Sequence, residues 1–452
     1  MFSGGANPRK LPRGKAIEGI IQMKSAYTPA QDGFYPVLKT IRENMPSFEA
    51  TGPELDRALE RQTLSPADFA SLLSPAAGTM LERIARRAHG ETLRHFGRTV
   101  QLFAPLYLAN VCTNRCVYCG FHAGRTIRRS ILSPEEIAAE AEALFAMGLR
   151  RVLVLTGDAP KITGADYIAN AVSIVARTIP SVGIEVPSLT REEYRLVSEA
   201  GCDSLTMFQE TYDEALYASL HPAGPKRDFG FRLDAPHRAV AGGMRCLTFG
   251  ALLGLSNWRE DIYCMAMHVA WVSRFFPHVE VAVSLPRVRP RGAEEAVSDH
   301  GDAKLGYTLH PVPDRDFVQA LLALRCFLPH AGITISSRES APMRDSLIPL
   351  GVTRVSAGVK TSVGGYAAAM AAGLLPDLAP SHQEQAVLPE KSMARPVQFL
   401  IDDPRSVREM SAAINRMGYH PVLADWLLPD NGTLPLSGGV VTALGDRPRT
   451  AV

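Results

Sequence analysis

The sequence predicts an α/β fold: a TIM-like (β/α)8 barrel with a helical N-terminal extension and a short C-terminal extension. Three observations support this prediction. The chain has 452 residues, which is enough for one such barrel with additions at both ends. From about residue 100 onward, short apolar runs alternate with longer amphipathic segments. The apolar runs are continuous, as expected for parallel strands that are buried on both faces.

Eight apolar runs are the expected strands, and each is too short to be a helix. The segments between them have the features of helices. Ser133 and Glu136 form a capping box around Pro134, and Gly148 closes that segment. Another helix is expected to begin at Asp314. The strands are expected at residues 101–108, 151–156, 181–186, 204–209, 245–252, 279–285, 332–337 and 354–357.

These elements divide the chain into four parts. Residues 1–50 are rich in Gly, Pro and Lys and are expected to be a loosely ordered arm. Residues 51–99 have leucines at helical spacing and form the helical extension. The barrel is assigned to residues 100–375, with a long surface loop expected at 291–315. The C-terminal extension, 376–452, should contain a helix at 405–417, a strand at 421–426 and a loose tail.

The composition excludes several classes of function. Hydrophobic residues make up 46% and charged residues 21% of the chain, as in an ordinary globular protein. The net charge is only +2, so no nucleic-acid partner is expected. There is no run of 18 apolar residues, so no membrane span is expected. Seven cysteines are too few for a disulfide scaffold, and a reducing, cytoplasmic setting is expected.

Three cysteines lie close together directly after the first expected strand. Cys112, Cys116 and Cys119 have C-x3-C-x2-C spacing, and the C-terminal end of a barrel strand is where this fold places its chemistry. Three thiolates are one fewer than the four that usually hold a [4Fe–4S] cluster, so one iron would stay open. The alternatives are structural zinc, with His122 as a nearby candidate ligand, or a disulfide. The other cysteines lie in apolar segments: Cys202, Cys246, Cys264 and Cys326.

Polar residues also end several of the expected strands, where a barrel enzyme binds its substrate. Carboxylates after a buried strand need a ligand or an ion-pair partner, and an arginine there suits a bidentate clamp on a carboxylate. The alternatives are a loop cap for Asp158, a salt bridge with arginine for the glutamates, and an ion pair of Arg338 with Glu339 or Asp345. Arg287 could also brace its own loop. The residues are Tyr107, Asp158, Glu185, Glu210, Arg287, Arg338 and Ser356.

The cysteine motif, with Tyr118, Gly120 and Phe121, resembles the signature of radical S-adenosylmethionine (SAM) enzymes. The resemblance implies a [4Fe–4S] cluster whose open iron binds the amino and carboxylate groups of SAM. Reductive cleavage of SAM then yields methionine and a 5′-deoxyadenosyl radical.

The same resemblance assigns cofactor-binding roles to several residues. Tyr118 would pack beside the adenine of SAM. Asp158 stands where the superfamily has the glutamate that binds the SAM amino group. Glu185 and Glu210 would lie near the ribose and methionyl groups, and Arg287 near the SAM carboxylate.

Further motifs resemble the tyrosine-lyase branch and, within it, the 2-iminoacetate synthases of thiamine thiazole biosynthesis. The resemblance implies cleavage of the Cα–Cβ bond of L-tyrosine to 2-iminoacetate and p-cresol. It also implies that Arg338 holds the tyrosine carboxylate, assisted by Ser356 and Tyr107. A flavodoxin- or ferredoxin-type reductant and thiazole synthase are the implied partners. The motifs lie in residues 73–77, 208–212, 221–229, 285–290, 336–340, 355–366, 398–399 and 402–403.

Four alternatives stand beside this assignment. A hydrogenase maturase that also cleaves tyrosine carries a second, C-terminal cysteine cluster, whereas this chain has no cysteine after Cys326. A lyase of another aromatic amino acid, such as tryptophan, is disfavoured by Gly120 and Phe121. A non-catalytic iron–sulfur carrier would not need the polar residues at the strand ends. The fourth alternative is a structural zinc protein, which metal analysis would identify.

The tail after Trp426 departs from the family, since Leu427 stands where an aspartate is expected.

Overall fold

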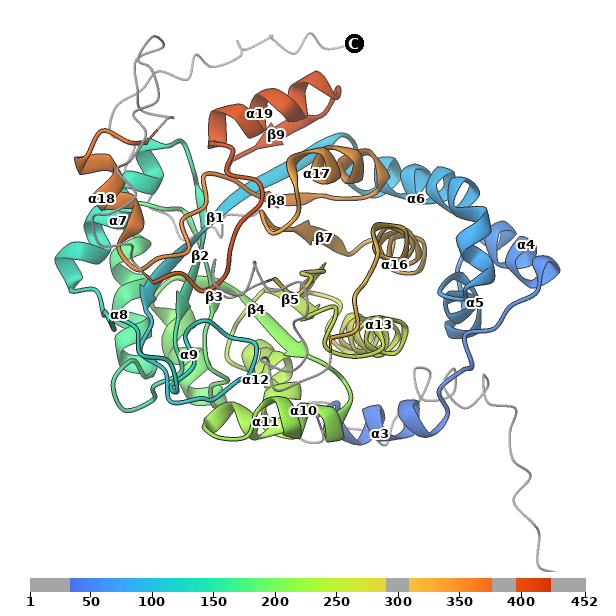
Figure 1. Ribbon diagram of the computed structural model, residues 1–452, viewed down its shortest axis with the longest axis horizontal. Coiled ribbons are helices and arrows are strands. Elements are labelled where there is room, and N and C mark those ends of the chain that lie inside the picture. Colours follow the sequence, from blue (N-terminus) through green and yellow to red (C-terminus); the bar gives the residue numbers. More distant parts are fainter. Residues whose placement is uncertain (1–32, 290–308, 376–395, 424–452) are drawn as a thin grey trace, which may run out of the picture.

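Eight parallel strands close into a barrel in the computed structural model, which describes residues 33–289, 309–375 and 396–423 (Figure 1). The strands follow one another around the barrel, and β1 pairs with both β8 and β2 to close it. All eight predicted strands are present, and their ends differ from the prediction by only a few residues. The strands are β1 Thr99–Ala109, β2 Arg151–Thr156, β3 Ser181–Glu185, β4 Cys202–Glu210, β5 Cys246–Ala251, β6 Glu280–Ser284, β7 Gly332–Ile335 and β8 Arg354–Ser356.

Helices surround the barrel on its outside, as Figure 1 shows. The predicted capping box is confirmed at the start of α7, where the Ser133 hydroxyl accepts from the Glu136 amide and Glu136 accepts from the Ser133 amide at 2.7 Å. The predicted helix start at Asp314 is confirmed by α16. The helices are α7 Pro134–Ala146, α8 Ala165–Val175, α9 Arg191–Glu199, α10 Glu214–Leu220, α11 Phe229–Leu233, α12 Ala235–Ala241, α13 Trp258–Phe275, α16 Asp314–Phe327, α17 Ala341–Leu347 and α18 Gly365–Ala371, with 3-10 turns η2 Pro225–Arg227 and η3 Ile348–Leu350.

The N-terminal extension is helical over α4 Gly52–Glu60, α5 Pro66–Leu72, η1 Ala76–Met80 and α6 Leu81–Phe96. The expectation of a loose arm was wrong for its C-terminal part, because helix α3 spans Tyr35–Glu43. Asp234 accepts from the amides of Phe34 and Tyr35 at 2.6 and 3.1 Å. The Phe34 ring also stacks on His268, with ring centroids 4.0 Å apart. These partners are distant in sequence, so local composition could not show them. Residues 1–32 lie outside the described residues.

The C-terminal extension contains helix α19, Val407–Arg416, and strand β9, His420–Val422. β9 pairs in parallel with Thr99–Gln101 of β1, before the stretch of β1 that pairs with β2. The predicted helix is therefore confirmed, as is the start of the predicted strand. The rest of that strand and the tail, and most of the expected loop at 291–315, lie outside the described residues.

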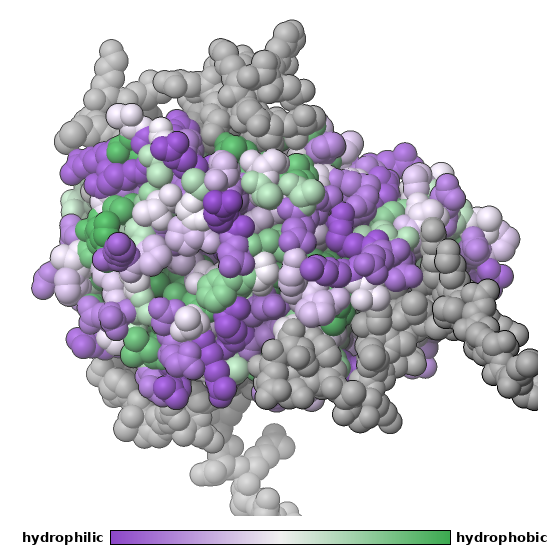
Figure 2. Space-filling view, turned by 90° about the horizontal axis from the view of Figure 1, so that it is seen from below, coloured by the Kyte–Doolittle hydropathy of each residue, from purple (hydrophilic) through white to green (hydrophobic). Residues whose placement is uncertain are grey.

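The surface mixes polar and apolar residues. On the face shown in Figure 2, hydrophilic side chains are interspersed with small hydrophobic patches. Ile162 is the most exposed of the large hydrophobic residues in the described parts of the chain, at 54%. None of the helices in the described ranges combines the length and apolar character that crossing a membrane requires.

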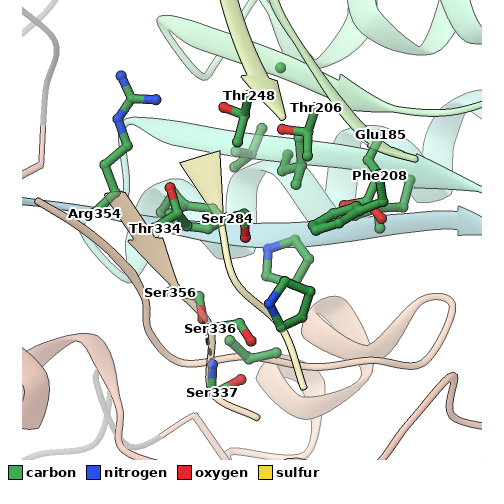
Figure 3. Close-up of a pocket in the computed structure, with 18 of the residues that line it drawn as sticks. Glu185, Thr206, Phe208, Thr248, Ser284, Thr334, Ser336, Ser337, Arg354 and Ser356 are labelled. Carbon is green, nitrogen blue, oxygen red and sulfur yellow. Dashed lines mark hydrogen bonds between the residues drawn. The ribbon is translucent and has the colours of Figure 1, made fainter. Parts of the chain in front are cut away.

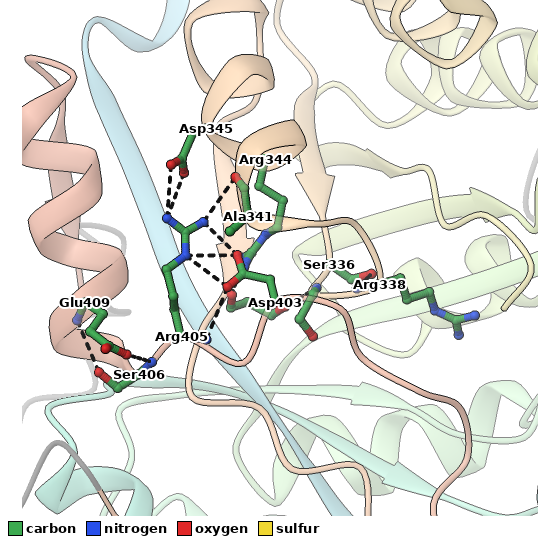
Figure 4. A network of polar contacts seen from close by, with 11 residues as sticks. Ser336, Arg338, Ala341, Arg344, Asp345, Asp403, Arg405, Ser406 and Glu409 are labelled. Carbon is green, nitrogen blue, oxygen red and sulfur yellow. Dashed lines mark hydrogen bonds and ion pairs between the residues drawn. The ribbon is translucent and has the colours of Figure 1, made fainter. Parts of the chain in front are cut away.

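A buried polar network holds the start of the C-terminal extension against the barrel (Figure 4). The Asp403 carboxylate is fully buried and contacts Arg344 at 2.5 Å and Arg405 at 2.6 Å. Arg405 also binds Asp345 at 2.9 Å, and Arg344 donates to the carbonyl of Ser356 at the end of β8. The network thus fixes the segment preceding Asp403 relative to the mouth of the barrel.

Replacing Asp403 should destabilise the protein. Asp403→Asn keeps the size of the side chain but leaves the buried Arg344 without its counter-charge and takes one of two carboxylates from Arg405, which costs about 3 kcal/mol or more. The midpoint of thermal unfolding should fall by several degrees. Asp56→Asn is the matched control, because its ion pair with Arg83 is half exposed and should contribute little. Equal midpoints for the two variants would contradict the role given to Asp403.

Candidate active site

The cysteine motif lies in a loop that begins at the end of β1 and folds back on itself. Asn110 accepts from the Ser130 amide at 2.7 Å and donates to the Arg128 carbonyl at 3.0 Å. The Arg129 guanidinium donates to the carbonyls of Asn110 and Phe121, each at 2.7 Å. The loop is therefore closed by side chains at its base, and its shape does not depend on a bound group alone.

All three cysteines of this loop line one cavity at the mouth of the barrel, which we call the cysteine cavity. They carry free thiols. Burial raises the pKa of Cys116 to about 12, partly offset by Lys226, so iron binding would have to displace its proton. In the described ranges no group of three His, Cys, Asp or Glu side chains is arranged to hold a single metal ion. A [4Fe–4S] cluster differs, because each cysteine binds a separate iron. The lining of the cysteine cavity includes Cys112, Cys116, Tyr118, Cys119, Asp158, Glu185, Glu210, Lys226 and Arg289.

Asp158 connects the end of β2 to the cysteine loop. Its Oδ2 accepts from the Asn114 amide group at 2.7 Å, and its carbonyl accepts from the Thr113 amide at 2.7 Å. Gly157 allows this approach, since a Cβ there would lie 2.1 Å from the Val111 carbonyl oxygen. Burial raises the pKa of Asp158, and the bond from Asn114 opposes the rise. Its other oxygen, Oδ1, is buried without a partner in the described structure, and this fits an amino group donating from the cavity.

Glu210 ends β4 in a backbone conformation that is rare for a residue with a side chain, with φ of +71°. Lys226 contacts its carboxylate at 2.5 Å, and Arg232 lies at 3.9 Å. Burial acts to raise the pKa of Glu210, but Lys226 and Arg232 outweigh it and lower the pKa overall. The salt-bridge alternative is therefore observed for Glu210, with lysine as the nearer partner. The carboxylate stays ionised in the cysteine cavity.

Glu185 differs from Glu210 in having no hydrogen bond or ion pair within the described part of the chain. Burial, together with the negative charge of Glu210, raises the pKa of Glu185 to about 7. Its side chain borders both the cysteine cavity and the cavity inside the barrel. Glu185 is thus placed where the two cavities meet and is free to accept a ligand.

Tyr118 lies against a histidine in the cysteine cavity. Its hydroxyl and the His221 Nε2 are 2.7 Å apart, and His221 Nδ1 lies 2.8 Å from the Tyr217 carbonyl. The Lys226 ammonium is 5.5 Å from the centre of the Tyr118 ring. The ring is held in place, which is consistent with the packing role expected for it.

The second cavity runs into the barrel, and we call it the barrel cavity (Figure 3). Tyr107 donates to Gln398 Oε1 at 2.7 Å, and the Ser356 hydroxyl accepts from the Ser337 amide at 3.0 Å. The two cavities adjoin one another, because they share six lining residues: Glu185, Phe208, Pro286, Arg338, Gln398 and Phe399.

Arg338 reaches into the junction of the two cavities without a carboxylate partner in the described structure. Its guanidinium lies 3.6 Å from the centre of the Phe399 ring and points away from the Asp403 network in Figure 4. The alternative ion pairs are not formed, because Glu339 binds Arg287 and Asp345 binds Arg405. Burial lowers the pKa of Arg338, offset only in part by Tyr107 and Glu185. A half-buried guanidinium without an ion-pair partner is a ready site for a carboxylate.

Arg287 does not have the surroundings expected of a cofactor ligand. It binds Glu339 with two nitrogens, Asp314 at 2.7 Å and the Val312 carbonyl at 3.0 Å, and it lines neither cavity. These contacts are those of the bracing alternative, with Arg287 joining the loop after β6 to Glu339 and to the start of α16. Arg289 lines the cysteine cavity instead and lies 3.1 Å from Asp402.

Sequence reasoning also missed several residues of the site. Asn114 and Lys226 join the cysteine loop to the loop after β4, since the Lys226 amide donates to Asn114 at 3.0 Å. Gly224, with φ of +96°, allows this contact, because a Cβ there would lie 2.2 Å from Asn114 Oδ1. The sequence pattern identified Gln398 and Phe399 only as part of a motif. Both residues are far in sequence from the barrel strands, so the sequence alone did not predict that they lie at the mouth of the barrel.

The fold and the cysteine cavity define a radical SAM enzyme, and residues 106–263 match the model of the radical SAM superfamily. Residues 284–420 match the biotin and thiamin synthesis associated domain. The chain belongs to the family of 2-iminoacetate synthases. It is 35% identical to the 2-iminoacetate synthase of Salmonella typhimurium over 83% of this chain and 91% of the relative. The Escherichia coli enzyme is 36% identical over the same shares.

A crystal structure of HydG, a maturase of the [FeFe]-hydrogenase, has the same overall fold. It superimposes with a TM-score of 0.71 at 26% identity, covering 88% of this chain and 81% of that chain. The family assignment means that the cofactors are a [4Fe–4S] cluster and SAM. The three free cysteines and the unpaired Asp158 Oδ1 in one cavity fit both groups.

Replacing any cysteine of the loop should abolish the cluster. The Ala variants of Cys112, Cys116 and Cys119 each remove a thiolate that nothing nearby can replace. Iron content and the brown absorbance of the reconstituted protein measure the loss. Cys264→Ala is the matched control, because Cys264 is buried within α13. Full cluster loading of the Cys116 variant would contradict this assignment.

Asp158→Ala should weaken the binding of SAM more than that of the substrate. A lost charge-assisted bond lowers affinity roughly tenfold to a hundredfold. Equilibrium binding of SAM to the cluster-loaded protein measures this loss. Asp158→Glu should be tolerated, since it restores the residue typical of the superfamily. If the Ala variant binds SAM with unchanged affinity, Asp158 does not bind SAM and only caps its loop.

Proposed function

We propose that this protein cleaves the Cα–Cβ bond of L-tyrosine and releases 2-iminoacetate and p-cresol. The observation that supports it most directly is the unpaired guanidinium of Arg338 at the junction of the two cavities. An amino acid whose carboxylate binds Arg338 would have its side chain in the barrel cavity and its amino group facing the cysteine cavity. The relatives named 2-iminoacetate synthase support the substrate.

The protein's own residues position the reactants. The cluster and SAM, when bound, supply a 5′-deoxyadenosyl radical for hydrogen abstraction from tyrosine. Cys112, Cys116 and Cys119 would hold the cluster, while Asp158, Tyr118, Glu185 and Glu210 would bind SAM. Arg338 would hold the tyrosine carboxylate, assisted by the hydroxyls of Ser356 and Tyr107. Gln398 and Phe399 line both cavities and would exclude water from the mouth.

Two protein partners follow from this function. SAM cleavage needs an electron, so we propose a flavodoxin- or ferredoxin-type reductant. The imine product reacts readily with water, so direct use by thiazole synthase is expected. The seven free cysteines, in the described structure, suit the reducing environment of the cytoplasm.

The proposed function is tested by anaerobic incubation of the cluster-loaded protein with SAM, dithionite and L-tyrosine. We expect equal amounts of p-cresol and 5′-deoxyadenosine, with glyoxylate from hydrolysis of the imine. L-Tryptophan in place of tyrosine should yield no 3-methylindole. If the protein cleaves tryptophan but not tyrosine, the assigned fold and cofactors still stand, but the assignment to thiamine biosynthesis is overturned.

Arg338 variants should separate substrate binding from cofactor chemistry. Arg338→Lys keeps the charge but loses the planar fork, and Arg338→Ala loses both, so p-cresol formation should collapse in both variants. Iron content and SAM affinity should be unchanged, and slow release of 5′-deoxyadenosine should persist. Arg287→Lys is the comparison variant, because it makes the same substitution at an arginine that lines neither cavity. Normal p-cresol formation by Arg338→Lys would exclude a bidentate clamp.

A further inference from the structure

The barrel cavity contains four hydroxyl groups from four neighbouring strands. Thr206 of β4, Thr248 of β5, Ser284 of β6 and Thr334 of β7 all line it. In the strand registers Thr206 lies beside Thr248, and Ser284 lies beside Thr334. In Figure 3, Thr206 and Thr248 lie farthest from Ser336, Ser337 and Ser356, and Ser284 and Thr334 lie between the two groups. We call these four residues the hydroxyl band.

The hydroxyls of the band have no hydrogen-bond partner among the residues that the structure describes. Thr248, Ser284 and Thr334 are nevertheless only 8%, 5% and 7% exposed. Their oxygens border the cavity and can bond to a group that fills it, whereas valine or alanine would suit the interior of a parallel strand equally well. The other polar groups at this end are engaged, since Arg354 binds Glu280 and Arg151 lies 3.4 Å from the Ser204 hydroxyl. The hydroxyl band therefore offers hydrogen-bond donors and acceptors to a ligand in the barrel cavity.

The cavity between its two polar ends is apolar. Arg338 and Ser356 lie at the end near the mouth, and the band lies at the other end. Thr334 lies beside Arg354 in the strand register, and Ser356 is two residues further along β8, which corresponds to about 6.6 Å towards the mouth. That spacing is similar to the length of a p-hydroxyphenyl group. The apolar walls include Phe103, Pro105, Leu155, Phe208 and Pro286.

We propose that the hydroxyl band binds the phenolic hydroxyl of the substrate and selects tyrosine over aromatic amino acids that lack this group. The inference rests on the proposed function, because it assumes an amino acid whose carboxylate binds Arg338. With the carboxylate fixed at one end, a tyrosine ring lies between the apolar walls and its hydroxyl reaches the band. Phenylalanine would leave the band unpaired and enclosed, and a site of this kind discriminates strongly against such an analogue.

The test measures equilibrium binding of L-tyrosine and L-phenylalanine to the cluster-loaded protein with SAM and without reductant. Thr248→Val and Thr334→Val, singly and together, remove hydroxyls and nearly keep the shape. Each single change should weaken tyrosine binding roughly tenfold, the usual effect of one lost hydrogen bond, and leave phenylalanine binding unchanged. Thr248→Ser, which keeps a hydroxyl, should retain most of the preference for tyrosine.

Thr92→Val is the matched control, because Thr92 is a buried threonine of α6 that bonds the Ala88 carbonyl and lies outside both cavities. It should leave both affinities unchanged. Equal weakening of tyrosine and phenylalanine by the band variants would overturn the proposal, since it would indicate a packing effect. Unchanged tyrosine affinity would also overturn it.

The wild-type protein distinguishes this proposal from the proposed function. If it cleaves tyrosine but binds phenylalanine equally well, the band has no selective role and the function stands. If it neither binds nor cleaves tyrosine, the proposed function fails and the inference fails with it.

Discussion

The pairing of β1 with three other strands is the constraint on which the site depends. β1 closes the barrel between β2 and β8, and its first residues also pair with β9. It leads directly into the loop of the three cysteines, and its inward side chains include Tyr107 in the barrel cavity. Because all neighbouring strands are parallel, their C-terminal ends meet at the same mouth. One strand therefore sets the position of the cysteines relative to the substrate cavity.

The charges at this mouth fall into two groups with different consequences. Asp403, Glu339 and Glu210 are buried with cationic partners, so their neighbours are held in fixed positions. Arg338 and Glu185 are close to these pairs but have no partner of their own in the described structure. Burial of unpaired groups reduces stability, and such groups persist in proteins where a ligand supplies the missing partner. This contrast separates the scaffold of the site from the part that binds.

The arrangement also explains how a largely apolar interior can accept a polar amino acid. The wall residues of the barrel cavity are apolar between Arg338 at the mouth and the hydroxyl band. The segment with Gln398 and Phe399 covers the mouth because the Asp403 network anchors the residues that follow it. A substrate would thus be held at both ends and shielded from water, which matters for a reaction that proceeds through a radical.

The sequence by itself determined the strands, most helices, the cysteine motif and the family, because these follow from local spacing and short motifs. The polar strand ends were also predictable, since a parallel barrel brings them together whatever the details of packing. The tertiary structure alone decided which of those residues are free to bind. Arg287 and Arg338 look alike in sequence, but Arg287 is occupied by Glu339 and Asp314 whereas Arg338 is not. The docking of α3 and the cover formed by Gln398 and Phe399 also required contacts between residues far apart in the chain, and no local pattern encodes such contacts.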